Sequence, residues 1–323
     1  MQKLEGIGLT QEVGKEGVWK NLVGFWNLVL FLLLVPVVFP AEAQSTDLAR
    51  LEYTYFPQSN SDNSFRRFRT FVNFPIALND KGAYLVPGLE YRSVNFKYRN
   101  DEFFSTKHLD RFQSFTGKLG YTFKMNEEWR FGLEGGLQAA SNFSGEKTVK
   151  DDFIYTGAIY FIKTKEEKAN AAPWRLIFGL SYSTTRGFPF PLPVINYYKR
   201  FKANLAYGLG IPKTNLKYYI EDKHEFQAFI TLDGFFANIQ ENFNPYLRSK
   251  PDSNRMAENI SMTVLLSGLG YQYNFTNHIS FYAYAGYTII NDIRLRDDDH
   301  EDLYTIDDNN TFYARGGLKF SIL

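Results

Sequence analysis

The stretch that decides the fold runs from Trp129 to Phe143 and reads WRFGLEGGLQAASNF. Its odd positions are mostly apolar, starting with Trp129, Phe131 and Leu133, whereas its even positions are mostly polar or glycine. Side chains of a β-strand alternate between two faces, so this pattern gives one apolar and one polar face. A strand of this length spans roughly 50 Å, whereas strands of soluble domains usually have about 5–6 residues. The length therefore favours a strand that crosses a membrane, for which about 9–11 residues are needed.

The same alternation recurs along the chain. We predict strands at residues 48–58, 65–78, 83–98, 112–125, 129–143, 151–165, 174–186, 192–200, 204–210, 214–221, 225–240, 260–275, 279–295 and 312–323. An even number of antiparallel strands is expected of a bacterial outer-membrane barrel. The sequence therefore predicts an all-β fold, a transmembrane antiparallel up-and-down β-barrel of about 14 strands. Segments 204–210 and 214–221, interrupted by Ile211-Pro212, leave 12 strands as the alternative.

The connections between these segments alternate in length. Short turn-forming stretches lie at residues 79–82, 126–128, 201–203, 222–224 and 276–278, and longer polar ones at 100–111, 144–150, 241–259 and 296–311. Short periplasmic turns and longer outer loops are typical of an outer-membrane barrel. Within segment 83–98 the apolar phase switches near Ser93, which indicates either a bulge or a strand that leaves the bilayer.

The N-terminal region predicts export. Residues 28–40 form an uninterrupted apolar run of 13 residues, a length that suits the core of a signal peptide better than a spanning helix. Ala41-Glu42-Ala43 follows as an A-x-A cleavage pattern, so we place the cut between Ala43 and Gln44. The predicted organisation is a signal peptide at 1–43 and a barrel at 44–323. A membrane anchor that extends upstream to Leu22 is the alternative.

The composition excludes several classes of protein. The chain has 323 residues and no cysteine, which rules out disulfides, zinc–thiolate sites and cysteine nucleophiles. Its formal net charge of +1 argues against a nucleic-acid partner, which would need a basic face. A mean hydropathy of −0.32 argues against a bundle of membrane-spanning helices. We expect no cofactor, and we expect outer-membrane lipid and the barrel assembly machinery as partners.

The C-terminus and several internal motifs resemble known outer-membrane proteins. Residues 315–322 (RGGLKFSI) resemble the insertion signal read by the assembly machinery, although the chain ends in Leu323 rather than an aromatic residue. Over about residues 48–323 the chain resembles an uncharacterised outer-membrane β-barrel family common in Bacteroidota. The residues that carry this resemblance are Gln44-Ser45, GLEYR at 88–92, PVINY at 193–197, GIP at 210–212 and Tyr218-Tyr219. The resemblance implies location and fold and carries no catalytic assignment.

The polar face of the predicted strands is charged with both signs. We expect these charges to line the lumen, because water or opposite charges can solvate them there and lipid cannot. The basic candidates are Arg50, Arg67, Arg69, Arg92, Lys118, Lys124, Arg130, Arg175, Arg315 and Lys319, and the acidic ones are Glu52, Glu90, Glu134 and Asp233. The basic excess predicts a weak preference for anions if the lumen is an open pore. A filled interior that ion pairs hold together is the alternative.

Few residues of the sequence could support an enzymatic function. His108 lies near Ser105 and Asp110, the residue types of a nucleophilic triad, although such a triad is defined by geometry rather than by sequence proximity. No G-x-S-x-G or H-E-x-x-H pattern occurs. We therefore predict a passive channel or a structural membrane protein and no enzyme. The alternatives are a lipid-modifying hydrolase and a soluble periplasmic β-sandwich that binds a ligand.

An acidic run lies in the last predicted outer loop. It contains Asp297, Asp298 and Asp299, whose oxygens suit a calcium ion. The run lacks the glycine and terminal glutamate of an EF-hand loop, so a solvated charge run is the preferred interpretation and we assign no metal site.

Overall fold

The computed structural model describes residues 46–57, 64–98, 106–145, 147–165, 172–184, 191–221, 223–245 and 255–322. The chain divides into two units, 1–41 and 42–323, and all described residues belong to the second. The predicted signal peptide and its cleavage site at Ala43 and Gln44 thus lie outside the described residues. Within the described part, no helix is long and apolar enough to cross a membrane.

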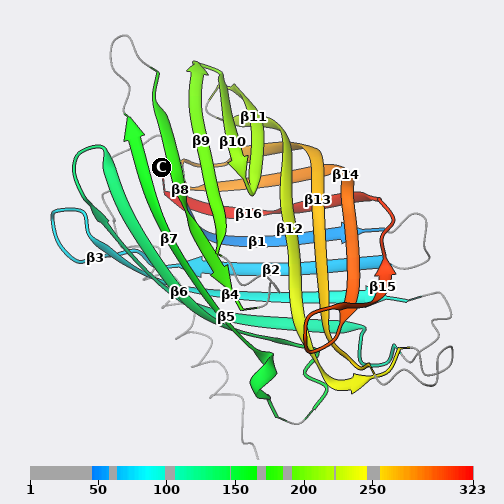
Figure 1. Cartoon of the computed structure of the whole chain (residues 1–323). Helices are drawn as coiled ribbons and strands as arrows, with labels where there is room; N and C mark the ends of the chain where they lie inside the picture. The colour runs from blue at the N-terminus through cyan, green and yellow to red at the C-terminus, as the bar shows by residue number, and fades with distance from the viewer. Residues whose placement is uncertain are drawn as a thin grey trace, which may run out of the picture. The chain divides into compact units, whose positions relative to one another are not determined.

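The second unit is a closed antiparallel β-barrel (Figure 1). Its wall consists of β1 (Thr46–Phe56), β2 (Ser64–Asn73), β4 (Tyr84–Lys97), β5 (Arg111–Lys124), β6 (Trp129–Ser141), β7 (Phe153–Lys165), β8 (Trp174–Ser183), β9 (Leu192–Lys202), β10 (Leu205–Ile211), β11 (Lys213–Ile220), β12 (His224–Phe243), β13 (Ala257–Asn274), β14 (Ile279–Arg296) and β16 (Phe312–Ile322). Each strand pairs with the next, and β16 pairs with both β14 and β1, which closes the ring.

The strand count settles the alternatives left open by the sequence. Two of the 16 strands, β3 (Ile76–Ala77) and β15 (Asp302–Asp307), pair only with β4 and β14, outside the ring, and the other 14 form the wall. The prediction of 14 strands is confirmed, and segments 204–210 and 214–221 are separate strands. The β-sandwich alternative is wrong, because the strands form one closed sheet.

The outer surface of the barrel is apolar. Every wall strand exposes at least one large apolar side chain. One from each, in chain order, is Leu51, Phe68, Leu89, Phe115, Leu133, Ile159, Phe178, Ile195, Leu209, Leu216, Ile230, Leu269, Phe281 and Leu318. A continuous belt of this kind would be unstable in water and is stable against hydrocarbon. The chain is an outer-membrane β-barrel and is located in the cell outer membrane.

The short turns form because polar side chains bond the backbone locally. The Asn79 Oδ1 accepts the backbone N–H groups of Lys81 at 3.0 Å and Ala83 at 3.2 Å, and Gly82 adopts a φ of +80°, which glycine tolerates without strain. The Thr276 hydroxyl accepts the backbone N–H of Ile279 at 3.0 Å in the same way. These turns mark the periplasmic end of the barrel, because periplasmic turns are the short ones.

Near the outer end the sense of the alternation reverses. Strand β4 pairs with β5 without a shift in register, so the phase switch near Ser93 is not a bulge. Val94 and Phe96 point inward and are buried, whereas Asn95 and Lys97 point outward and are exposed. The strand therefore leaves the bilayer here, and its inner face becomes apolar as in a soluble protein.

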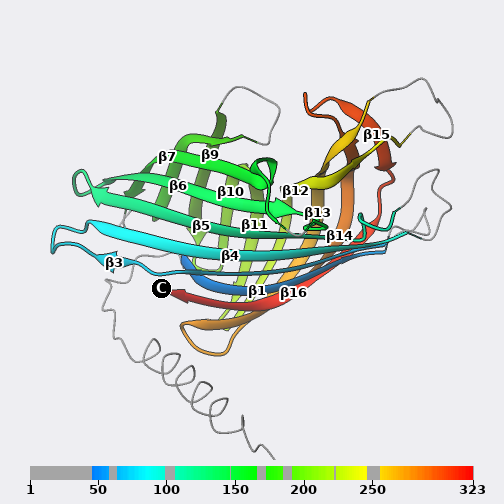
Figure 2. The same ribbon diagram turned by 90° about the horizontal axis from the view of Figure 1, so that it is seen from below.

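An aromatic cluster fills the outer half of the interior. Phe235 of β12 lies against the opposite wall, with ring centroids 6.1 Å from Phe65, 6.0 Å from Phe96 and 6.2 Å from Phe112. The outer part of β12 runs beside β13 (Figures 1 and 2) and meets β6 on the other side of the barrel, where Asn238 pairs with Ser141. The packed apolar layer was not predicted, since alternation alone does not distinguish a lipid-facing side chain from a core side chain.

Candidate functional site in the barrel lumen

Ion pairs span the lumen between walls that are not neighbours in the sheet. The carboxylate of Asp233 on β12 accepts two hydrogen bonds from Arg67 on β2, at 2.9 and 2.6 Å, and one from Arg315 on β16, at 2.6 Å. Only 2% of the Arg67 side chain is exposed. These bonds therefore tie opposite walls of the barrel together at about mid-height of β12.

A second carboxylate completes this network. Glu52 on β1 accepts the Tyr282 hydroxyl at 2.7 Å and lies 3.6 Å from Arg67, 3.7 Å from Arg315 and 3.7 Å from Arg50. The Tyr282 side chain is fully buried. A buried charge is tolerated when an opposite charge lies beside it, and here two carboxylates lie among three guanidinium groups. Among the described residues, Glu52 Oε1, Arg50 Nε and Arg67 Nε are buried without a hydrogen-bond partner.

The neighbouring predicted charges also pair. Glu90 binds both Arg69, at 2.8 Å, and Arg92 on the inner faces of β2 and β4. Lys319 donates to Gln272 at 2.9 Å, and its ammonium group lies 4.7 Å from the centroid of the Tyr282 ring.

The remaining predicted charges lie apart from the network. Lys118 and Glu134 pair with each other at 3.3 Å on β5 and β6. Arg130 donates to the carbonyl oxygen of Gly82 at 2.9 Å in a periplasmic turn, and Lys124 is exposed at the same end of the barrel. Arg175 is half-buried near the periplasmic end of β8.

Sequence reasoning missed several polar residues of the interior. Lys213 on β11 donates to Gln227 at 3.0 Å and lies 4.9 Å from the centroid of the Phe229 ring. Lys217 pairs with Glu225 at 2.9 Å. A signal was present, because 213, 215 and 217 are alternate polar positions, but the short segment around them had no clear apolar partner set.

The two sides of the lumen differ in how tightly they are filled. On the side of β1, β13 and β14, inward side chains such as Thr54, Val264 and Leu266 are fully buried. On the side of β5–β9, inward side chains near the outer ends, such as Phe112, Ala140 and Ile154, are buried, as is Tyr198 of β9. Others remain partly exposed, and these are Thr116, Lys118, Glu134, Gln138, Thr156, Ala158, Ser181, Val194 and Asn196. Small and mostly uncharged side chains thus line a strip of accessible interior.

The candidate catalytic and metal residues have other partners. His108 pairs with Glu241 at 3.3 Å rather than with Asp110, and Ser105 lies outside the described residues. Asp297 binds Arg255, whereas Asp298 and Asp299 are exposed. In the described ranges, no group of three His, Cys, Asp or Glu side chains could hold a metal ion.

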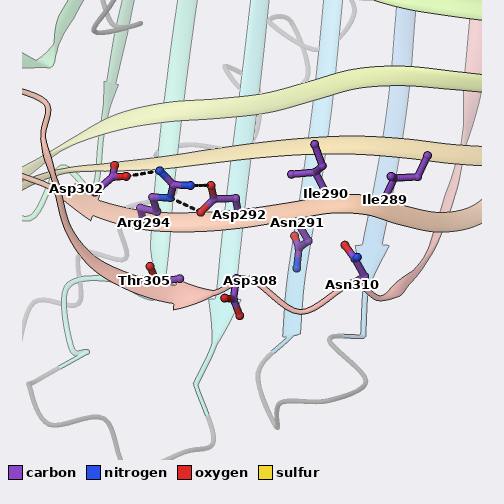
Figure 3. A pocket seen from close by; sticks show the side chains of 9 residues that line it. All are labelled: Ile289, Ile290, Asn291, Asp292, Arg294, Asp302, Thr305, Asp308 and Asn310. Atoms are coloured by element: carbon purple, nitrogen blue, oxygen red, sulfur yellow. Dashed lines mark hydrogen bonds and ion pairs between the residues drawn. The ribbon is translucent and has the colours of Figure 1, made fainter.

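A polar recess of about 500 Å³ lies between β14 and the segment containing β15 (Figure 3). Arg294 lies at its centre and pairs with both Asp292 and Asp302. Ile289 and Ile290 form its apolar rim. Arg294 therefore offsets the charges of Asp292 and Asp302, and Asp308 also lines the recess.

Comparison with solved structures finds other outer-membrane barrels. An outer membrane channel from Pseudomonas putida F1 is 9% identical, with 90% of this chain and 100% of that chain covered and a TM-score of 0.42. LpxR from Salmonella typhimurium is 8% identical (84% and 99% covered, TM-score 0.37), and outer membrane phospholipase A from Escherichia coli is 12% identical (85% and 97%, TM-score 0.35). A shared architecture does not specify an activity.

No curated protein matches this chain in sequence. A family model described as a domain of unknown function (DUF6268) matches residues 41–321, almost the whole barrel unit. The resemblance to an uncharacterised barrel family is thereby confirmed, and the chain belongs to the DUF6268 family.

Proposed function

We propose that this chain is a passive outer-membrane channel without enzymatic activity. The observation that carries the proposal is the uneven filling of the lumen. The ion-paired half holds the barrel in one shape, and the strip along β5–β9 leaves small, partly exposed side chains facing inward. Water and small solutes would follow this strip.

A weak preference for anions is part of the proposal. Along the strip Glu134 pairs with Lys118. The predicted lumen residues are ten basic and four acidic ones, so ion pairs with Glu52, Glu90 and Asp233 leave a basic excess. Field effects favour the counter-ion of the charges that line a pore, and the ion pairs offset part of the basic excess, so anions are favoured only slightly.

The test is single-channel recording of the purified chain in planar lipid bilayers under a salt gradient. We expect discrete steps with a small reversal potential in the anion direction. Ser181→Trp, which points into the strip, should lower the conductance, whereas Leu180→Trp, which points into lipid, should not. An inactive wild-type chain, or equal behaviour of the two variants, would overturn the channel in favour of a structural role.

A further inference from the structure

The wall of the barrel is short along the membrane normal at β10 and β11. These strands have 7 and 8 residues. At about 3.3 Å per residue and a tilt of about 45°, they rise roughly 16 and 19 Å, whereas the apolar band of such a barrel is about 25 Å tall. Figure 1 shows that both strands end beside the middle of β12. This hairpin therefore stops inside the membrane.

The neighbouring strands do not close the space on the outer side of this hairpin. On one side the last pair is Ile211 with Ile195, and β9 extends three residues further to Leu192. On the other side the last pair is Lys213 with Thr231, followed by one bond from the Leu232 N–H to the Pro212 carbonyl oxygen, and β12 continues beyond it beside β13. Within the described ranges, no strand lies between β9 and β12 on the outer side of Pro212. We call this gap the lateral notch.

Side chains around the lateral notch face hydrocarbon. Leu209, Ile211 and Leu232 are 51%, 53% and 46% exposed, as are lipid-facing residues elsewhere on the belt. Gly210 allows β10 and β9 to meet closely here, because a Cβ atom at this position would lie 1.9 Å from the carbonyl oxygen of Ile195. The hairpin tip thus lies within the apolar belt and not above it.

A groove leads from the tip along the outer wall. Pairing between β10 and β11 ends at Gly208 and Asn215, and the groove of about 570 Å³ begins there. It passes Ala228 and ends at Leu269, the most exposed of the large apolar residues that the structure describes. Its lining is nearly all apolar, and its volume suits a small organic molecule.

We propose that the lateral notch and its groove form a side portal, through which a small uncharged apolar solute passes from the lumen into the outer leaflet. The inference rests on the proposed channel. Only molecules that dissolve in hydrocarbon gain free energy on this path, because an ion would lose its hydration in the belt. On the lumen side, Val194 and Asn196 of β9 are partly exposed and uncharged, so the strip continues to the notch along β9, whereas Lys213 borders it on β11 and is bound to Gln227.

The experiment uses vesicles with lipopolysaccharide in the outer leaflet, the full chain inserted, and N-phenyl-1-naphthylamine as the probe. Its fluorescence rises when it enters lipid. We expect the chain to accelerate this rise, and Ala228→Trp, which fills the groove from the lipid side, to abolish the acceleration. Ala314→Trp is the matched control, because it places the same bulk on the lipid face of β16.

Ion conductance measured in parallel separates the two proposals and shows that each variant has folded. A wild-type chain that conducts ions but does not accelerate the probe overturns the side portal alone. Equal probe uptake by the Ala228→Trp and Ala314→Trp variants also overturns the side portal. The groove would then bind a lipid acyl chain or a second copy of the chain and would not conduct the probe. A wild-type chain that conducts nothing overturns the channel itself.

A second measurement does not depend on the tolerance for tryptophan. The chain has no cysteine, so a single introduced cysteine is the one thiol that a reagent can modify. A charged, membrane-impermeant thiol reagent should modify Leu209→Cys faster than Leu180→Cys, because the notch admits lumen water to the first position only. Equal rates would contradict the portal.

Discussion

Replacing Asp233 with asparagine removes the negative charge that two arginines share across the lumen. The carboxylate accepts three guanidinium hydrogen bonds, two from Arg67 and one from Arg315. Asparagine keeps the shape and one acceptor oxygen but leaves Arg67 buried beside a neutral group. Breaking a buried ion pair by removing one partner costs about 3–5 kcal/mol, and we expect the lower end, about 3 kcal/mol, because some hydrogen bonding survives.

The assay is equilibrium unfolding in urea of the chain inserted in lipid vesicles, followed by tryptophan fluorescence. Glu134→Gln is the matched control, since it removes a carboxylate paired at 3.3 Å with Lys118, and both side chains are about one-third exposed. Solvent screens such a pair, so its loss should cost about 0–1 kcal/mol. The reasoning fails if both variants lower the free energy of unfolding by the same amount.

Three further outcomes are expected. Phe235→Ala should lower the free energy of unfolding by about 3–5 kcal/mol in the same urea assay through a cavity between β12 and the opposite wall, clearly more than lipid-facing Phe226→Ala. Leu133→Arg should cost about 2–4 kcal/mol near the bilayer centre, and a neutral result there would contradict its lipid-facing position. Burial alone would raise the pKa of Asp297, but hydrogen bonds from Arg255 and the Glu301 backbone hold that pKa below its usual value. The stability this carboxylate adds to its loop is thus lost as pH falls through the lowered pKa. Arg255→Ala should move the loss to higher pH, as NMR titration of the Asp297 carboxyl would show.

Strand positions were predictable because side-chain alternation is a local property of extended backbone. Segments such as 129–143 and 225–240 show it without reference to any partner, and the ring of 14 strands follows from counting them. The turns were predictable for the same reason, since the Asn79 and Thr276 side chains bond backbone groups within four residues.

The sequence by itself therefore determined a membrane barrel and the residue types of its lumen. Only the tertiary structure decided which charges meet, because Arg67 and Asp233 are 166 residues apart and face each other across the lumen only once the ring of strands has closed. The aromatic filling of the outer half has the same origin. A phenylalanine that faces lipid and one that faces a core look alike in sequence, and the path of the neighbouring strands is what separates them.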